Sequence, residues 1–153
     1  MQRPGHVGAA LLGYLPLGAS LHYAEEVRLA LLGLLLAVAV ASLPDSDQGL
    51  PIQHRGPTHT VWFVAACTVI AGCTGWLFGT PAVGLVVGNA TGLSLASHLV
   101  ADSITPMGIR PYLPLSAREH CFDLVYAANA KANYVIFGVG VAATVVVHVP
   151  LLV

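Results

Sequence analysis

Apolar residues fall into five long stretches along the chain, separated by short polar segments. The stretches cover residues 7–22, 28–43, 60–79, 82–101 and 133–153. Two intervals, 56–101 and 132–153, contain no Lys, Arg, Asp or Glu. Lipid offers no hydrogen-bond partners to an exposed backbone, so segments that cross a bilayer form helices. The pattern predicts an all-α, polytopic helical membrane protein with about five transmembrane helices, forming a single integral membrane domain over residues 1–153.

The segment between the last two apolar stretches has a different character. It opens with TPMGIRPYLP, whose prolines predict an extended loop. Ser116 and Glu119 then stand at the spacing of a helix-initiating capping box. Phe122 and Tyr126 follow at helical spacing, so we expect a short interfacial amphipathic helix over residues 117–131, lying along the membrane surface.

Composition agrees with a membrane location. Hydrophobic residues make up 56% of the chain and charged residues only 8%, whereas a soluble domain carries roughly 25% charged residues. The lipid bilayer is therefore the expected environment. With a net charge of −1 and no basic run, nothing points to nucleic acid as a partner. Glycines recur between residues 72 and 92, which predicts close helix packing.

Ionisable residues gather around the segment SLPDSDQGLPIQHRGPTHTVWF, residues 42–63. A serpentine path through the five stretches returns the start of the first and the end of the fourth to the membrane face that carries this segment. His22 and His148 fall on or near the opposite side, and His120 lies on the expected surface helix. Converging ionisable groups in or beside a membrane are costly and usually functional. The shared face holds seven candidate metal ligands: His6, Asp45, Asp47, His54, His59, His98 and Asp102.

The spacing of these residues suits a metal site. His98 and Asp102 are four positions apart, which puts both side chains on one face of a helix. Asp45 and Asp47 are two positions apart, so an extended turn would aim both to the same side. A mixed imidazole and carboxylate set favours Zn²⁺, Mn²⁺ or Fe²⁺ over Ca²⁺. Because the candidates exceed the needs of one ion, we expect one divalent ion or two ions bridged by a carboxylate.

Single residues admit other interpretations. Asp45 follows Leu-Pro and could form a turn, and Asp102 could cap a helix. Arg55 could hold a substrate phosphate or carboxylate with its forked guanidinium, or pair with Asp45 or Asp47. Asp47 and Arg55 are the candidate catalytic residues, with one carboxylate acting as general base rather than ligand.

Basic residues indicate the orientation of the chain. Only Arg28 lies on the side opposite the cluster. By the excess of Lys and Arg on cytoplasmic loops, the cluster faces the cytoplasm from the plasma membrane. The cluster side carries Arg3, Arg55, Arg110, Arg118 and Lys131.

Three motifs carry a resemblance to a known family. They are LPDSD at 43–47, HRGPTH at 54–59, and His98, Asp102, Thr105 and Gly108 in the segment HLVADSITPMG. Together with the early His6 they resemble the YdjM-type membrane-bound metal-dependent hydrolases, a LexA-regulated inner-membrane family. The resemblance implies a helical membrane protein with a metal-dependent hydrolase site.

We therefore expect a membrane-bound metal-dependent hydrolase that acts on a lipid or other phosphoester, or on a soluble small molecule. Thr58 and Thr105 would hydrogen-bond to the ligands. The alternative is a non-enzymatic metal-binding membrane protein, either a transporter or an assembly factor. A transporter should place its ligands near mid-membrane on broken helices, whereas here they stand at segment ends. A third interpretation is a packed helical protein whose polar loop only caps helices.

Overall fold

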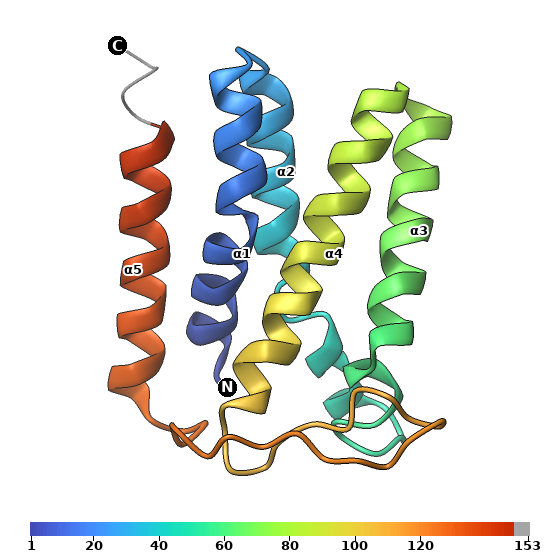
Figure 1. Cartoon of the computed structure of the whole chain (residues 1–153), viewed down its shortest axis with the longest axis vertical. Coiled ribbons are helices and arrows are strands. Elements are labelled where there is room, and N and C mark those ends of the chain that lie inside the picture. The colour runs from blue at the N-terminus through green and yellow to red at the C-terminus, as the bar shows by residue number, and fades with distance from the viewer. Residues whose placement is uncertain (149–153) are drawn as a thin grey trace.

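The computed structural model describes residues 1–148, which form an all-helical bundle (Figure 1). α1 lies between α5 and α2, and α4 crosses obliquely to pair with α3. The α1–α2 and α3–α4 turns lie at one end of the bundle, and the amino terminus and the loops lie at the other. In chain order the helices are α1 (Arg3–Tyr23), α2 (Val27–Val40), η1 (Pro44–Gly49), η2 (Pro57–His59), α3 (Val61–Phe78), α4 (Pro81–Ser103) and α5 (Ala130–His148).

The five α-helices match the five predicted apolar stretches. α1 begins at Arg3 rather than at residue 7, because Pro4 is tolerated in the first turn of a helix. The part of the last stretch at 149–153 lies outside the described residues. Four stretches are long and apolar enough to cross a membrane: Val27–Gly49, Val61–Phe78, Pro81–Ser103 and Ala130–His148. The 21 residues of α1 span about 30 Å, the thickness of the bilayer core.

Glycines set the close approach of two helix pairs. A Cβ atom on Gly8 of α1 would lie 2.5 Å from the carbonyl oxygen of Ile136 in α5. Between α3 and α4, a Cβ atom on Gly84 would lie 2.8 Å from the carbonyl oxygen of Gly72. Small residues let helix backbones meet in this way where lipid supplies no hydrophobic drive for association. The predicted close packing of the glycine-rich region is confirmed.

Polar side chains tie α2 to its neighbours. Tyr14 of α1 donates its hydroxyl to the carbonyl oxygen of Ala30 at 2.9 Å. Ser94 of α4 donates to the carbonyl oxygen of Ala37 at 2.7 Å. Each bond satisfies a buried hydroxyl that hydrocarbon would leave without a partner. The first bond joins α1 to α2, and the second joins α2 to α4, which carries two of the candidate ligands.

The expected amphipathic helix over 117–131 was wrong, because this segment is irregular and α5 begins only at Ala130. Instead, backbone N–H groups of this segment form hydrogen bonds with carbonyl groups at the carboxyl end of α4. Phe122 N–H donates to the carbonyl oxygen of Ser103, and Leu124 N–H to that of Ile104, both at 2.8 Å. The last carbonyls of a helix have no partner within it, so this long-range pairing outweighs the local capping signal.

The same segment is joined to the loop that follows α4. Ile109 and His120 form an antiparallel bridge with N–H···O distances of 3.0 and 2.8 Å. Gly108, beside this bridge, has φ +57°, and a Cβ atom there would lie 2.8 Å from the carbonyl oxygen of His120. Only glycine fits without strain. His120 therefore lies in a bridge and not on a surface helix.

The opposite end of the bundle holds the other two histidines. His22 of α1 and His148 of α5 are both buried, with ring centroids 5.2 Å apart. They lie on the far side from the polar cluster, as the predicted topology requires.

Candidate metal centre

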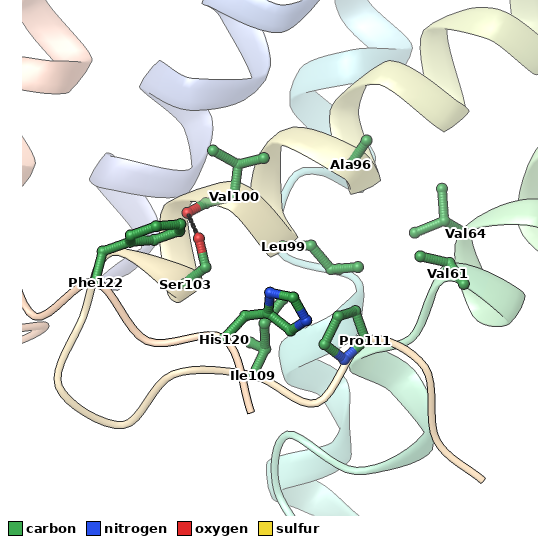
Figure 2. A pocket seen from close by; sticks show the side chains of 10 residues that line it. All are labelled: Val61, Val64, Ala96, Leu99, Val100, Ser103, Ile109, Pro111, His120 and Phe122. Atoms are coloured by element: carbon green, nitrogen blue, oxygen red, sulfur yellow. Dashed lines mark hydrogen bonds between the residues drawn. The ribbon is translucent and has the colours of Figure 1, made fainter. Parts of the chain in front are cut away.

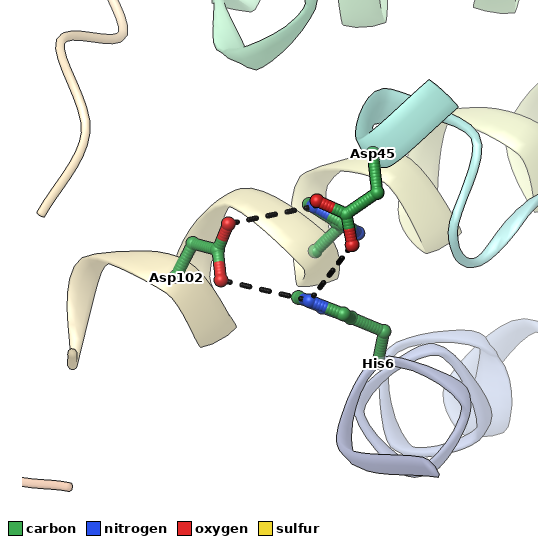
Figure 3. Close-up of side chains that lie close together, drawn as sticks. His6, Asp45 and Asp102 are labelled. Carbon is green, nitrogen blue, oxygen red and sulfur yellow. Dashed lines mark ion pairs between the residues drawn. The ribbon is translucent and has the colours of Figure 1, made fainter. Parts of the chain in front are cut away.

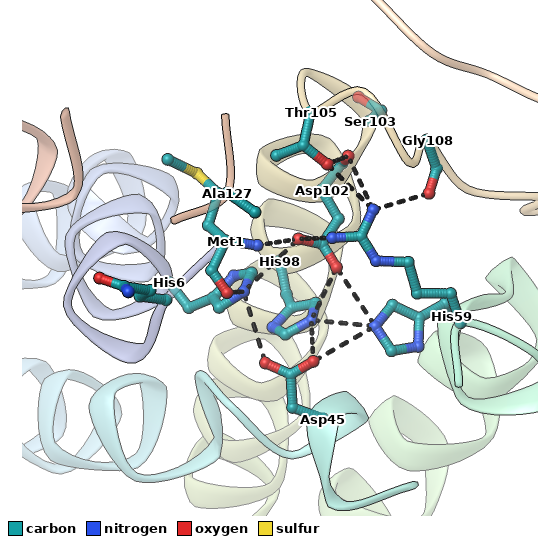
Figure 4. A network of polar contacts seen from close by, with 12 residues as sticks. Met1, His6, Asp45, His59, His98, Asp102, Ser103, Thr105, Gly108 and Ala127 are labelled. Carbon is teal, nitrogen blue, oxygen red and sulfur yellow. Dashed lines mark hydrogen bonds and ion pairs between the residues drawn. The ribbon is translucent and has the colours of Figure 1, made fainter. Parts of the chain in front are cut away.

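The seven predicted ligands converge at the loop end of the bundle. Figure 4 shows five of them: His6, Asp45, His59, His98 and Asp102. His6 comes from the second turn of α1, and His98 and Asp102 from the last turns of α4. η1 carries Asp45 and Asp47, η2 carries His59, and His54 lies in the turn between them. The convergence expected from the serpentine path is confirmed.

The innermost part of the cluster pairs two carboxylates with three imidazoles. Asp45 lies 3.4 Å from His6 Nε2 and 3.7 Å from the Nε2 atoms of both His59 and His98. Asp102 lies 3.6 Å from His6 Nε2, 3.3 Å from His59 Nε2 and 3.6 Å from His98 Nε2. The two carboxylates thus face one another across the same imidazole nitrogens (Figure 3).

These separations match the coordination sphere of a small divalent ion. Ligand atoms about 2.0–2.2 Å from a tetrahedral Zn²⁺ stand about 3.3–3.6 Å apart. One ligand atom from each of His6, Asp45, His98 and Asp102 lies within 4.8 Å of the other three. The cluster could therefore hold a metal ion without rearrangement of the backbone.

A hydrogen bond on the far side of its ring orients His98. His98 Nδ1 lies 2.8 Å from the carbonyl oxygen of Ala41. A carbonyl only accepts, so Nδ1 carries the proton and Nε2 presents a lone pair to the cluster. His6 Nε2 lies 3.1 Å from the carbonyl oxygen of Met1, and the His6 ring stacks on that of His98, with the ring centroids 3.7 Å apart and the planes 10° apart.

Asp47 lies behind His59 and organises the η1–η2 loop. Its Oδ2 accepts from Thr58 Oγ1 at 2.8 Å and from Arg55 N–H at 3.0 Å. Thr58 Oγ1 is also 3.0 Å from His59 Nδ1, which orients that ring as Ala41 orients His98. Asp47 Oδ1 lies 2.8 Å from His54 Nδ1. The expected contact of Thr58 with the ligand set is present.

The outer residues form a second candidate ion site. Asp45, Asp47 and His54 also offer ligand atoms within 4.8 Å of one another. Asp45 belongs to both sets, so it stands where a bridging carboxylate would stand. It is also half-buried, and His54 is 36% exposed at its side chain. This part of the cluster is therefore the part that a molecule from outside the bundle can reach.

Arg55 binds the end of α4. Its Nη2 lies 3.0 Å from Asp102 Oδ1, and its Nη1 donates to Thr105 Oγ1 and to the carbonyl oxygen of Gly108, both at 2.9 Å. One of the two roles considered for Arg55 was pairing with Asp45 or Asp47, but the guanidinium pairs with Asp102. Arg55 has φ +58°, a left-handed conformation that costs a non-glycine residue about 1–2 kcal/mol.

The two oxygens of Asp102 have different environments. Oδ1 contacts the guanidinium of Arg55 and the amino group of Met1. Oδ2 is buried and has no hydrogen-bond partner among residues 1–148. An orphaned buried carboxylate oxygen is costly unless a cation reaches it. Oδ2 faces His59 and His98. A cation that bound this oxygen would therefore lie inside the inner cluster.

The electrostatics of His59 reflect the same carboxylates. Burial disfavours its imidazolium form, but the carboxylates of Asp102 and Asp45 outweigh burial and raise the pKa of His59 above its usual value. A divalent ion bound at Nε2 would compete with that proton.

One contributor to the site escaped the sequence interpretation. The carbonyl of Ala41 belongs to the backbone of an apolar segment. No side-chain pattern marks a backbone acceptor, so only the packing of α2 against α4 reveals it.

Comparison with known proteins agrees with this arrangement of motifs. No curated protein and no solved structure matches the chain. A family model described as YdjM inner membrane protein matches residues 1–152, which is nearly the whole chain. The chain therefore belongs to the YdjM inner membrane protein family.

Proposed function

We propose that this protein is a membrane-bound, metal-dependent hydrolase of phosphoesters, with its site at the cytoplasmic face. The observation that carries the proposal is the inner cluster, in which Asp45 and Asp102 surround the Nε2 atoms of three buried histidines at 3.3–3.7 Å. Maintaining two carboxylates at this spacing inside a bundle is costly without a cation.

The donor chemistry suits a borderline transition metal. Three imidazole nitrogens and two carboxylates favour Zn²⁺, Mn²⁺ or Fe²⁺. A bound ion of this kind would polarise a phosphoester oxygen and lower the pKa of a water molecule. The residues that would hold it are His6, Asp45, His59, His98 and Asp102.

In this proposal His54 would move a proton beside that ion, and Asp47 would orient His54. His54 Nδ1 lies 2.8 Å from Asp47 Oδ1, so its Nε2 is the basic nitrogen and its ring is partly exposed. The carboxylate of Asp47 is already occupied by Thr58, Arg55 and His54, so its role is to orient these groups. If a second ion binds through Asp45, Asp47 and His54, His54 is a ligand instead. The number of ions per chain separates these two arrangements.

The position of the cluster supports a surface-facing enzyme over a transporter. The ligands lie at the ends of α1 and α4 and in η1 and η2 (Figure 4). A transporter would hold its cargo near the middle of the bilayer on broken helices. Here the last turns of α4 are continuous helix.

The direct test is metal-dependent turnover by the purified full chain in lipid nanodiscs. Metal is removed with a chelator, Zn²⁺, Mn²⁺ or Fe²⁺ is restored separately, and release of phosphate or alcohol is measured from p-nitrophenyl phosphate and from phospholipids. We expect turnover only after metal is restored, together with one or two ions per chain by elemental analysis.

Two variants make the test specific. Asp45→Asn removes a proposed ligand charge at a half-buried position and should abolish turnover. His22→Ala removes a buried histidine at the opposite end of the bundle and should keep it. Ion uptake into proteoliposomes that Asp45→Asn abolishes, without turnover of any phosphoester, would favour the transporter instead.

A further inference from the structure

An apolar cleft lies beside the metal centre, between the amino end of α3 and the carboxyl end of α4 (Figure 2). Its volume is about 300 Å³. The residues that form its wall are almost all apolar, and Ala96, Val100 and Phe122 are exposed at its rim. The wall includes Val61, Val64, Leu99, Val100, Ile109 and Phe122. Since α3 and α4 span the membrane, the cleft opens toward lipid.

The cleft lies along the same turns of α4 that carry two of the proposed ligands. Leu99 and Ser103 of its wall directly follow His98 and Asp102 in α4. His120 lies at its loop end (Figure 2), and the buried Nε2 of His120 has no hydrogen-bond partner among the described residues. A molecule in the cleft would therefore meet a polar group at the loop end of the cleft.

A second, polar cleft of about 170 Å³ adjoins the first. His54, Arg55 and Arg110 line it, and Ile109 lines both clefts. Arg55 Nε is buried without a partner in the described part of the chain. Within the described residues Arg110 pairs with Glu119, which also lines this cleft, at 3.2 Å. Both side chains are exposed, and an exposed pair of this kind is weak. The polar cleft thus offers cationic groups suited to a phosphate.

We propose that the apolar cleft holds one acyl chain of a membrane phospholipid whose phosphate headgroup lies in the polar cleft beside the metal centre. The proposal rests on the proposed function, since it names the substrate class of that site. An apolar chain and an anionic head joined in one molecule match two clefts of opposite character that share Ile109. A soluble phosphoester would use only the polar cleft.

The test narrows the apolar cleft by a substitution to a larger residue at its rim. Ala96 is exposed on α4 and lines the cleft, so Ala96→Phe narrows it without adding bulk to the core. Ala66 is exposed on α3 and is not among the residues that form any described cleft, so Ala66→Phe is the matched control. The probe is phosphatidic acid carrying a diazirine near the end of one acyl chain, incorporated into nanodiscs with the full chain.

After illumination, mass spectrometry maps the cross-linked residues. We expect labelling concentrated on the wall of the cleft, reduced at least about fivefold by Ala96→Phe and unchanged by Ala66→Phe. Metal content should stay equal in all three proteins. Labelling spread evenly over the exposed faces of α3 and α4, or unaffected by Ala96→Phe, would overturn the proposal.

Turnover separates this inference from the proposed function. Ala96→Phe should lower hydrolysis of phosphatidic acid while leaving that of p-nitrophenyl phosphate intact. Specific labelling without any metal-dependent turnover would leave the lipid site standing and remove the hydrolase. Turnover of p-nitrophenyl phosphate with diffuse labelling would support the hydrolase and remove the lipid site.

Discussion

Arg55 and Asp102 form a buried ion pair between the η1–η2 loop and the end of α4, with Nη2 3.0 Å from Oδ1. The Arg55 side chain is only 8% exposed and that of Asp102 is not exposed at all. The same guanidinium donates to Thr105 and Gly108. The pair therefore joins the loop that carries four of the seven candidate ligands to the helix that carries two others.

The first prediction concerns this pair. Arg55→Met keeps most of the side-chain volume but leaves Asp102 without its guanidinium, and breaking a buried pair costs about 3–5 kcal/mol. We expect a clearly lowered melting temperature in detergent. Arg110→Met is the control, because Arg110 and Glu119 are both exposed and such a pair contributes below about 1 kcal/mol. Unchanged stability in Arg55→Met would mean that the guanidinium serves the substrate alone.

The second prediction concerns the imidazole ligands. His98→Ala and His6→Ala, made separately, should each lower the metal affinity at least about tenfold, as the loss of even an outer partner of a ligand does. Isothermal titration with Zn²⁺ measures this. His148→Ala removes a buried histidine that lies far from the cluster and should bind Zn²⁺ as the unmodified chain does. Equal affinity in all variants would remove the metal centre.

The third prediction separates two neighbouring threonines. Thr58→Val removes the hydroxyl that contacts Asp47 and His59, so metal affinity should fall about 10–100-fold. Thr60→Val removes the amino-terminal cap of α3, where Thr60 accepts from Phe63 N–H, and should cost about 1 kcal/mol of stability. Zn²⁺ titration and thermal unfolding of both variants check the contrast. A similar loss of affinity in Thr60→Val would argue against a specific role for Thr58.

The fourth prediction tests the helix packing. Gly8→Ala places a Cβ atom 2.5 Å from the carbonyl oxygen of Ile136, so α1 and α5 must separate at a cost of about 1–3 kcal/mol. In Gly138→Ala the added Cβ atom meets nothing within 4 Å, and the better helix propensity of alanine should be neutral or slightly stabilising. Thermal unfolding in detergent should rank the two variants in this order. The reverse order would contradict the close α1–α5 contact.

The fifth prediction concerns orientation. Gln48 lies in η1 at the loop end of the bundle, and Glu26 lies in the α1–α2 turn at the opposite end; both are exposed. With the native cysteines replaced by serine, Gln48→Cys should react with a membrane-impermeant maleimide only from the cytoplasmic side, and Glu26→Cys only from the other. Intact spheroplasts and inside-out vesicles provide the two sides. Labelling of Gln48→Cys from outside would move the site to the other face and contradict the charge rule.

The covalent order of residues was enough to predict the helical membrane fold and most of the candidate site. Long uncharged stretches have one low-energy form in lipid, so the helices followed from composition. Their number then placed His6 and His98 at one face, because an even number of crossings separates them. The four-residue spacing of His98 and Asp102 predicted their shared helix face for the same local reason.

Only the tertiary structure decided how the polar groups pair. Ser116 stands at the spacing of a capping box, but no helix begins there. The segment instead makes long-range hydrogen bonds to the end of α4, where Phe122 N–H donates to the carbonyl oxygen of Ser103. The choice of Asp102 over Asp45 and Asp47 as the partner of Arg55 likewise depends on which carboxylate the packed helices bring within 3.0 Å. Residue spacing describes neighbours along one helix or turn. These contacts instead join residues 19 positions apart (Ser103 and Phe122) and 47 positions apart (Arg55 and Asp102), and they are set by how the helices pack.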